Sequence, residues 1–391
     1  MNPLPPKRGF PNAEYEARAK RARLRMAEED LDAIVVTSPH NVRYFSGFSS
    51  QFWESPTRPW FVIVPRVGAA IAVVPEIGAP AFEATWIDRV LSWPAPQPED
   101  DGISLLADTL ERLDRRSGRI GWEMGRESII RMPIKDFDTL RAKLPGLEFV
   151  DGSPLIWSLR MVKSAREIGH IRHICQLASH AFEALPTRLE LGDSELSAAR
   201  KLSAELIARG ADAIPFIAAC SGPGGYDQII VGSRERALDK RDVLFIDLGA
   251  LYDGYSCDFD RNFAFGPLTE DAAKAHDAVW RATEAGIAAA RPGATTTDLF
   301  RAMASVLEAE GSQGLNVGRL GHGLGLQLTE PPSNMPGDDT PLIPGMVMTI
   351  EPGREYAPGK MIVHEENVVI TEDGCELLTR RAPREMPVIG A

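Results

Sequence analysis

Residues 243–266, VLFIDLGALYDGYSCDFDRNFAFG, form two apolar, strand-length segments separated by Asp253-Gly254. An Asp-Gly pair between such segments is a strong signal for a tight hairpin turn, so the two segments are expected to pair side by side. Asp247 ends an apolar run in the first segment, and Asp258 lies in the second. Burying a carboxylate is costly unless it is paired or metal-bound. The hairpin therefore predicts that Asp247 and Asp258 can share one site.

A second interpretation places these acids at the surface, at the ends of strands. The sequence leaves both interpretations open for Asp247 and Asp258. For Asp253 and Asp260 the surface position is favoured, because acidic side chains are seldom fully buried.

His322 lies between two glycines in GHGLGLQLTEPP, residues 321–332. Glycines remove side-chain bulk, so a large or charged group could approach the imidazole closely. Taken alone, such a histidine is more often a packed residue of a tight turn. Whether it binds a metal ion depends on carboxylates that arrive from elsewhere in the chain.

Two further acids share the context of Asp247. Glu351 follows the apolar run of residues 347–350, and His364-Glu365-Glu366 interrupts an expected strand over 361–371. Alternation along a strand lets one of these two glutamates face inward. Four acids and one histidine, each ending or interrupting an apolar strand, form a ligand set suited to Mn, Co, Fe or Zn.

Length and composition limit the class of protein. A chain of 391 residues is long enough for two domains. The net charge of −12 argues against a nucleic-acid binder, because no basic surplus neutralises phosphates. The apolar runs are too short to span a membrane, and the N-terminus lacks the apolar segment of a signal peptide. The four cysteines are widely spaced, which favours buried free thiols in a cytoplasmic protein.

The order of expected elements differs between the two halves. The first half alternates helices and strands and predicts a small α/β domain, with a boundary near 155–163. Its expected helices and strands are 12–31, 32–39, 60–66, 69–76, 103–114 and 119–125. The second half groups hairpins with helices and predicts an α+β domain with an antiparallel sheet. Its expected elements besides the 243–266 hairpin are 165–187, 193–210, 214–221, 228–232, 270–290, 297–310, 320–330, 346–353 and 361–371.

The order Asp-x10-Asp, His-x28-Glu-x13-Glu resembles metallopeptidase family M24, which includes prolidase, aminopeptidase P, methionine aminopeptidase and creatinase. The motifs that carry it are IDLGALYDGYSCDFDR, GHGLGLQLTEPP, TIEPG and VHEENVVITEDG. HNVRYFSGF (40–48) and LRMVKSAREI (159–168) extend the resemblance over nearly the whole chain. It implies a pita-bread catalytic domain over 159–391, preceded by a smaller creatinase-like α/β domain over 1–158.

The resemblance also implies a site. Two divalent ions (Mn, Co, Fe or Zn) would be held by Asp247, Asp258, His322, Glu351 and Glu365. Glu365 is preferred to Glu366 because EENVVIT aligns with the last strand of the family. Glu351 would act as the base, beside His322, and the protein would be a homodimer acting on a short peptide or small molecule.

Four positions depart from the peptidase pattern. Thr329 and Ile230 stand where the peptidases carry two accessory histidines, and Val363 replaces an arginine that faces the substrate. Asp260 replaces a threonine. A hydroxyl or alkyl group cannot transfer protons near neutral pH as an imidazole does.

Three functions therefore stay open. The first is a dinuclear hydrolase of an amide, of which a Xaa-Pro peptide is the commonest family substrate. The second is chemistry on a small solute, as in creatinase, ectoine hydrolase or dimethylsulfoniopropionate lyase, although Leu328 stands where that lyase has an acid. The third is a binding protein without activity.

Candidate substrate-binding residues are Thr329, Tyr255, Trp53 and Arg58. Arg58 could clamp a carboxylate in place of the missing family arginine. Alternatively, Trp53 and Trp60 pack together and Arg58 pairs with Glu54. Tyr255, Tyr356 and Asp260 are the groups nearby in sequence that could replace an imidazole proton donor.

Overall fold

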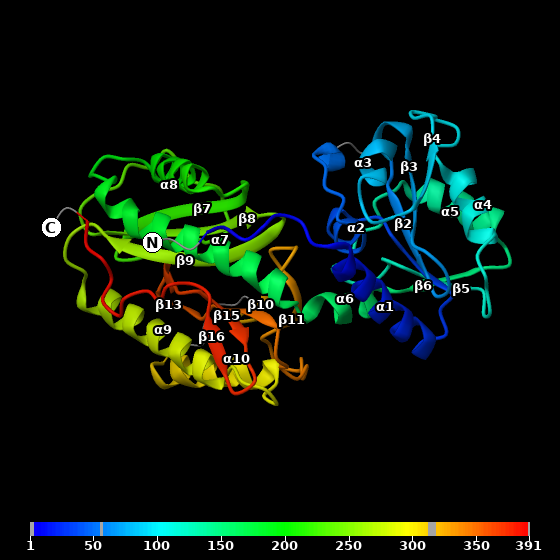
Figure 1. Ribbon diagram of the computed structural model, residues 1–391. Helices are drawn as coiled ribbons and strands as arrows, with labels where there is room; N and C mark the ends of the chain where they lie inside the picture. Colours follow the sequence, from blue (N-terminus) through cyan, green and yellow to red (C-terminus); the bar gives the residue numbers. More distant parts are fainter. Residues whose placement is uncertain (1–3, 55–57, 312–317, 390–391) are drawn as a thin grey trace. The chain divides into compact units, whose positions relative to one another are not determined.

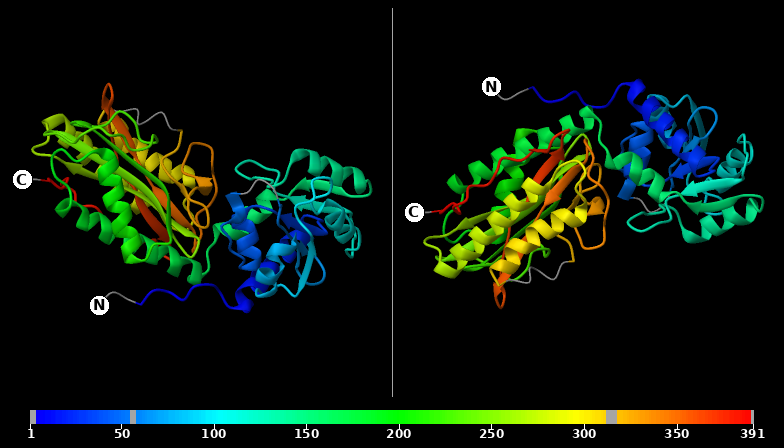
Figure 2. Two further views of the ribbon diagram at one scale, coloured as in Figure 1. Left: turned by 90° about the horizontal axis from the view of Figure 1, so that it is seen from above. Right: turned by 90° about the horizontal axis from the view of Figure 1, so that it is seen from below.

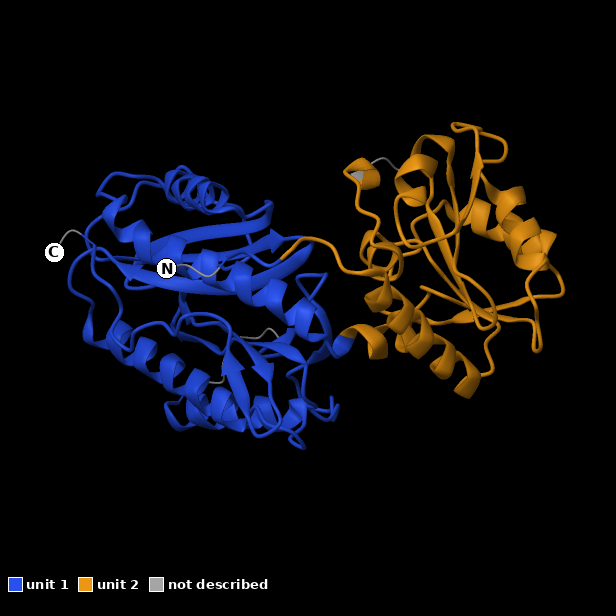
Figure 3. Cartoon of the chain, in the orientation of Figure 1, with its two compact units in different colours: residues 1–6, 161–391 blue, residues 7–160 orange. Residues whose placement is uncertain are grey.

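A computed structural model describes residues 4–54, 58–311 and 318–389. The chain divides into two compact units, shown in Figure 3. Residues 7–160 form one unit, and residues 1–6 with 161–391 form the other. No helix of the described residues is long and apolar enough to cross a membrane.

The unit of residues 7–160 is a mixed sheet with helices, in the strand order β4-β3-β2-β1-β5-β6. Strands β1/β5, β5/β6 and β3/β4 are parallel, whereas β1/β2 and β2/β3 are antiparallel. The α/β prediction for this half is confirmed. Its elements are α1 (Asn12–Glu28), β1 (Ala33–Val36), α2 (Pro39–Ser46), η1 (Phe52–Glu54), β2 (Phe61–Pro65), β3 (Ile71–Pro75), η2 (Glu76–Gly78), α3 (Ala79–Glu83), β4 (Arg89–Trp93), α4 (Ile103–Glu111), β5 (Arg119–Trp122), α5 (Ile134–Lys143), β6 (Glu148–Asp151) and α6 (Ser153–Met161).

The second unit contains two larger sheets, β7-β8-β9 and β11-β10-β12-β15-β16, and the β13-β14 hairpin. Its elements are α7 (Ala165–Ala184), η3 (Leu185–Thr187), α8 (Glu195–Arg209), β7 (Ala213–Pro223), β8 (Asp242–Tyr252), β9 (Tyr255–Ala264), α9 (Glu270–Ala289), α10 (Thr296–Ala309), β10 (His322–Gly323), β11 (Glu330–Ser333), β12 (Val347–Ile350), β13 (Gly353–Ala357), β14 (Lys360–Val363), β15 (Glu366–Ile370) and β16 (Cys375–Leu377).

Helices cover the outer side of each sheet in this unit (Figures 1 and 2). Helix α7 packs on β8 and β9 and α8 packs on β7, while α9 packs on β12 and pairs with α10. Strands β9 and β15 contact each other and so bring the two sheets together. A hydrophobic core includes Phe245, Val279, Met303, Met348, Ile350 and Val368. The predicted α+β, pita-bread class is confirmed.

The expected hairpin forms. β8 and β9 pair antiparallel without a register shift, and Asp253 and Gly254 turn with φ of 48° and 75°. Two positive φ values match the right-handed twist of the strands, which explains the Asp-Gly pair. All four cysteines are free, as expected, with Cys375 partly exposed and the others buried.

Three predicted strands differ from the structure. Residues 228–232 form no strand, and the strand expected over 320–330 is reduced to the two residues of β10 before β11 begins at Glu330. The strand expected over 361–371 breaks between β14 and β15, at His364 and Glu365. Apolar alternation does not reveal the break at His364 and Glu365, because a polar residue that leaves the ladder keeps apolar neighbours on both sides.

Candidate metal centre

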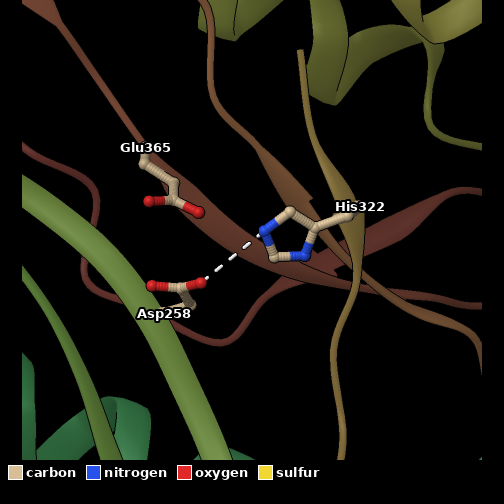
Figure 4. A group of neighbouring side chains, drawn as sticks. All are labelled: Asp258, His322 and Glu365. Carbon is tan, nitrogen blue, oxygen red and sulfur yellow. Dashed lines mark ion pairs between the residues drawn. The ribbon is translucent and has the colours of Figure 1, made fainter. Parts of the chain in front are cut away.

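Asp258, His322 and Glu365 bring three potential ligand atoms within 4.8 Å of one another. Asp258 comes from β9, His322 from β10, and Glu365 from the break between β14 and β15 (Figure 4). The Nε2 atom of His322 lies 3.6 Å from Oδ2 of Asp258. All three residues are buried. Segments distant in the sequence therefore converge on one small, polar, enclosed point.

The orientation of His322 is fixed by its other ring nitrogen. Nδ1 lies 2.9 Å from the carbonyl oxygen of Gly323, which can only accept, so Nδ1 carries the proton. Nε2 then carries the lone pair of the ring, and it faces the carboxylates of Asp258 and Glu351. A hydrogen bond on the far nitrogen is the usual way in which proteins orient an imidazole ligand.

The glycines on both sides of His322 allow close approach of neighbouring backbone. A Cβ at Gly321 would lie 2.3 Å from the carbonyl oxygen of Thr349, and one at Gly323 would lie 2.4 Å from that of Pro331. A side chain on either of these glycines would therefore collide with neighbouring backbone. They let neighbouring strands close around His322.

Glu351 and Asp247 join the same cluster. Oε1 of Glu351 lies 3.5 Å from Nε2 of His322, and its side chain is 26% exposed. Thr349 accepts a hydrogen bond from the backbone N–H of His322 and donates one to Oε1 of Glu351. Burial, followed by the charge of Glu351, raises the pKa of Asp247 to about 7. Glu351 is thus more accessible to a substrate than Asp258, His322 or Glu365.

The buried carboxylates lack the partners that would balance their charge. Oδ1 of Asp247 and Oε1 of Glu365 are buried without a hydrogen-bond partner among the described residues. Burial, and then the neighbouring carboxylates, raise the pKa of both Asp258 and Glu365 well above the usual range. Such a cluster is unfavourable as it stands and is stabilised by divalent cations. The donor set therefore fits a divalent metal centre.

We predict that metal removal destabilises the protein more as the pH rises. Between an unfolded pKa of 3.8 and a folded, metal-free pKa of about 7, Asp247 keeps a proton that the unfolded chain has released. The unfolding free energy of metal-free protein therefore falls as the pH rises through this window. The Tm difference between metal-loaded and chelator-treated protein should be smallest near pH 4 and grow towards pH 8. A difference that does not change with pH would contradict this expectation.

Glu366, the neighbour of Glu365, has a different environment. It is fully buried, and it accepts hydrogen bonds from Arg261, Arg381, Thr379 and the backbone of Ala382. Its charge is balanced inside the protein. The structure therefore brings Glu365, and not Glu366, to Asp258 and His322.

The positions that depart from the peptidase pattern differ in their exposure to solvent. Thr329 is partly buried and Val363 is buried, but the side chain of Ile230 is 78% exposed. Asp260 is only 1% exposed, so its expected surface position is wrong. Nothing in the local sequence distinguished it from an acid at a strand end.

Three of the predicted substrate residues, Tyr255, Trp53 and Arg58, have other partners in the structure. The hydroxyl of Tyr255 donates to Oε1 of Glu167, 2.9 Å away, which ties it to helix α7. Trp53 and Arg58 belong to the unit of residues 7–160. Trp53 packs on Trp60, as the alternative interpretation expected, and the backbone N–H of Arg58 donates to Asp101. The proposed partner of Arg58, the side chain of Glu54, is outside the described residues.

Sequence reasoning missed three supporting residues. Thr349 links His322 to Glu351, and the side chain of Asn367 both donates to and accepts from the backbone of Asp258. Nζ of Lys163 lies 3.3 Å from Oε2 of Glu330, and both side chains are almost fully buried. The signal available for each was a polar residue inside an apolar segment.

The fold and the cluster define a metallohydrolase of the pita-bread class. The profile of metallopeptidase family M24 matches residues 169–372, and that of the creatinase/prolidase N-terminal domain matches residues 18–162. The chain belongs to metallopeptidase family M24, whose members use divalent metals.

Relatives that match nearly the whole chain carry the names of dipeptidases. It is 29% identical to the probable dipeptidase PepE of Mycobacterium tuberculosis over 98% of both chains. It is 28% identical to the Xaa-Pro dipeptidase of Pyrococcus furiosus, over 91% of this chain and 95% of the relative. The crystal structure of dipeptidase PepE from Mycobacterium ulcerans matches with a TM-score of 0.85 and 28% identity, covering 97% of this chain and 99% of that one.

Proposed function

We propose that the protein is a dinuclear metal-dependent dipeptidase that hydrolyses short peptides, with Xaa-Pro dipeptides as one substrate class. The observation that carries this proposal is the convergence of His322, Asp258 and Glu365 in one buried group. Asp247 and Glu365 each have a buried oxygen without a hydrogen-bond partner among the described residues. The names of the dipeptidase relatives support the substrate class.

The proposed ligands are Asp247, Asp258, His322, Glu351 and Glu365. Divalent ions held there, such as Mn, Co, Fe or Zn, would supply Lewis-acid chemistry for attack of water on an amide carbon. The donor set of carboxylates with one imidazole suits all four of these metals.

Glu351 is proposed to take the proton from the attacking water at its carboxylate. It is well placed because its side chain is partly exposed while Asp258 and His322 are almost fully buried. The hydrogen bond from Thr349 holds Oε1 in position. Thr329 and Tyr255 stay proposed substrate contacts, of which Tyr255 is already bonded to Glu167.

The test combines metal analysis with a substrate panel. Purified protein should contain about two divalent ions per chain and should hydrolyse dipeptides more efficiently than small zwitterions such as creatine. The panel should contain Xaa-Pro dipeptides, dipeptides without proline, and the zwitterions. A metal-loaded protein that cleaves only a zwitterion would contradict the peptidase assignment, and a metal-free protein without hydrolytic activity would favour a binding protein.

We also propose that the protein is a homodimer and that Arg58 binds the substrate carboxylate. In support, Nε of Arg58 is buried without a hydrogen-bond partner among the described residues. Arg58→Ala should raise KM for peptides with a free carboxylate about tenfold or more, because a charge-assisted hydrogen bond would be lost. KM for the corresponding C-terminal amides should change little. An unchanged KM for every carboxylate substrate would reject this role.

A further inference from the structure

Asp260 lies on the same face of the β8–β9 hairpin as two proposed ligands. It is directly opposite Asp247 in the ladder, which has no register shift here, and it is two residues after Asp258. Side chains directly opposite each other, and those two residues apart on a strand, point to one face of a sheet. Asp260 therefore faces the side of the sheet on which Asp258 meets His322.

The carboxyl group of Asp260 is buried and has no compensating partner. Its side chain is 1% exposed, and neither Oδ1 nor Oδ2 has a hydrogen-bond partner among the described residues. The neighbouring Arg261 uses its guanidinium on Glu366 and on backbone carbonyls, among them that of Asp260 itself. A hydrogen-bond donor for this carboxylate is therefore missing among the described residues.

Two other buried acids of this unit, Asp242 and Glu366, do have hydrogen-bond donors. Asp242, on the same hairpin and also 1% exposed, accepts hydrogen bonds from Arg236 and from the backbone N–H of Asp239. Glu366 is balanced by two arginines. An acid buried for structural reasons is therefore given donors in this protein, whereas Asp260 shares its lack of partners with Asp247 and Glu365.

Asp260 is thus a further carboxyl group on the face of the hairpin that carries Asp247 and Asp258, at a place where hydrogen-bond donors are missing among the described residues. An additional anion at this position is favourable only when cations are bound close to it.

We propose that Asp260 is a sixth protein ligand of the metal centre. The threonine of the peptidase pattern has no anionic oxygen to offer at this position. The inference rests on the proposed dinuclear function. An extra carboxylate makes the site richer in hard oxygen donors, which favours Mn²⁺ relative to Zn²⁺. The centre should therefore bind Mn²⁺ more tightly than it would with threonine at this position.

The experiment uses the full chain after chelator treatment and measures Mn²⁺ affinity by calorimetry and Tm with and without Mn²⁺. Asp260→Asn keeps the shape and removes the charge, and Asp260→Thr supplies the residue of the peptidase pattern. Asp242→Asn is the matched control, because it removes an equally buried acid of the same hairpin that has its own partners.

Both Asp260 variants should bind Mn²⁺ at one site about 10–100-fold more weakly than the parent. Metal-free Asp260→Asn should melt above the metal-free parent, because an uncompensated charge is gone, and with Mn²⁺ it should melt below the parent. Asp242→Asn should lower Tm in both states and leave Mn²⁺ affinity unchanged. The ratio of Zn²⁺ affinity to Mn²⁺ affinity should be higher in Asp260→Thr than in the parent.

Parental Mn²⁺ affinity in the Asp260 variants would overturn the inference, as would an equal loss of affinity in Asp242→Asn. If Asp260→Asn does not fold, the Mn²⁺ affinity of Asp260→Thr decides in the same way. A parent protein that binds no divalent ion would refute the proposed dinuclear function itself. A parent that binds two ions, with variants that bind them equally well, would refute only the role of Asp260.

Discussion

Replacing His322 with alanine is expected to remove bound divalent metal and to lower kcat/KM by about 10³-fold or more. Nε2 of His322 lies 3.5 Å from Glu351 and 3.6 Å from Asp258, so one substitution removes the nitrogen donor from the middle of the cluster. Glu351→Ala should have an effect of the same order, because it removes both a ligand and the proposed base. Elemental analysis after dialysis and steady-state kinetics measure the two effects.

His276→Ala is the matched control for this experiment. His276 is a buried histidine of the same unit, and burial lowers its pKa to about 4. Its loss should affect stability while metal content stays at the parental level. Full metal occupancy in a triple Asp258, His322 and Glu351 alanine variant would show that the ions bind elsewhere. A loss of stability alone in His322→Ala would identify His322 as a packed turn residue.

The Thr329→His variant is expected to hydrolyse Xaa-Pro dipeptides about 10²–10⁴-fold faster than the parent, because general acid–base catalysis by one residue has this typical effect. Neither Thr329 nor Ile230 titrates near neutral pH, so protonation of the leaving amine should be slow in the parent. The parent should therefore be at least about a hundredfold slower on Xaa-Pro dipeptides than an ordinary prolidase.

Thr329→Asn provides the control, since it adds a polar group of intermediate size without an imidazole. It should leave the rate near that of the parent, and the rate of Thr329→His should show a new dependence on pH near neutrality. Parental turnover of Xaa-Pro dipeptides at ordinary prolidase rates would mean that another residue supplies the proton. A Thr329→His variant no faster than the parent would mean that the geometry of the site limits the rate.

Local sequence patterns determined much of this fold. The turn between β8 and β9 requires positive φ at two successive residues, and few residue pairs adopt this conformation as easily as Asp253-Gly254. This pair therefore specified the β8–β9 hairpin. The same hairpin brought Asp247 and Asp258 onto one face. Each of these features depends on residues close in the sequence, where turn chemistry and alternation act directly.

The sequence also indicated the ligand candidates, for a physical reason. An acid that ends an apolar strand must be compensated when it is buried, so Asp247 and Glu351 were conspicuous. The assignment of Glu365 rather than Glu366 came from the family resemblance. Alternation alone could not choose between them, because it assigns neighbouring residues to opposite faces without saying what each face meets.

Tertiary structure decided what surrounds each acid. Glu366 meets two arginines that are distant in sequence, whereas Glu365 meets Asp258 and His322. Asp260 looked like a surface acid, yet the pairing of β9 with β8 and its contacts with β15 remove it from water. The sequence by itself determined the hairpin, the family and the chemical types of the ligand candidates. Only the tertiary structure decided which buried acids are neutralised, because compensation depends on partners that packing brings from other elements.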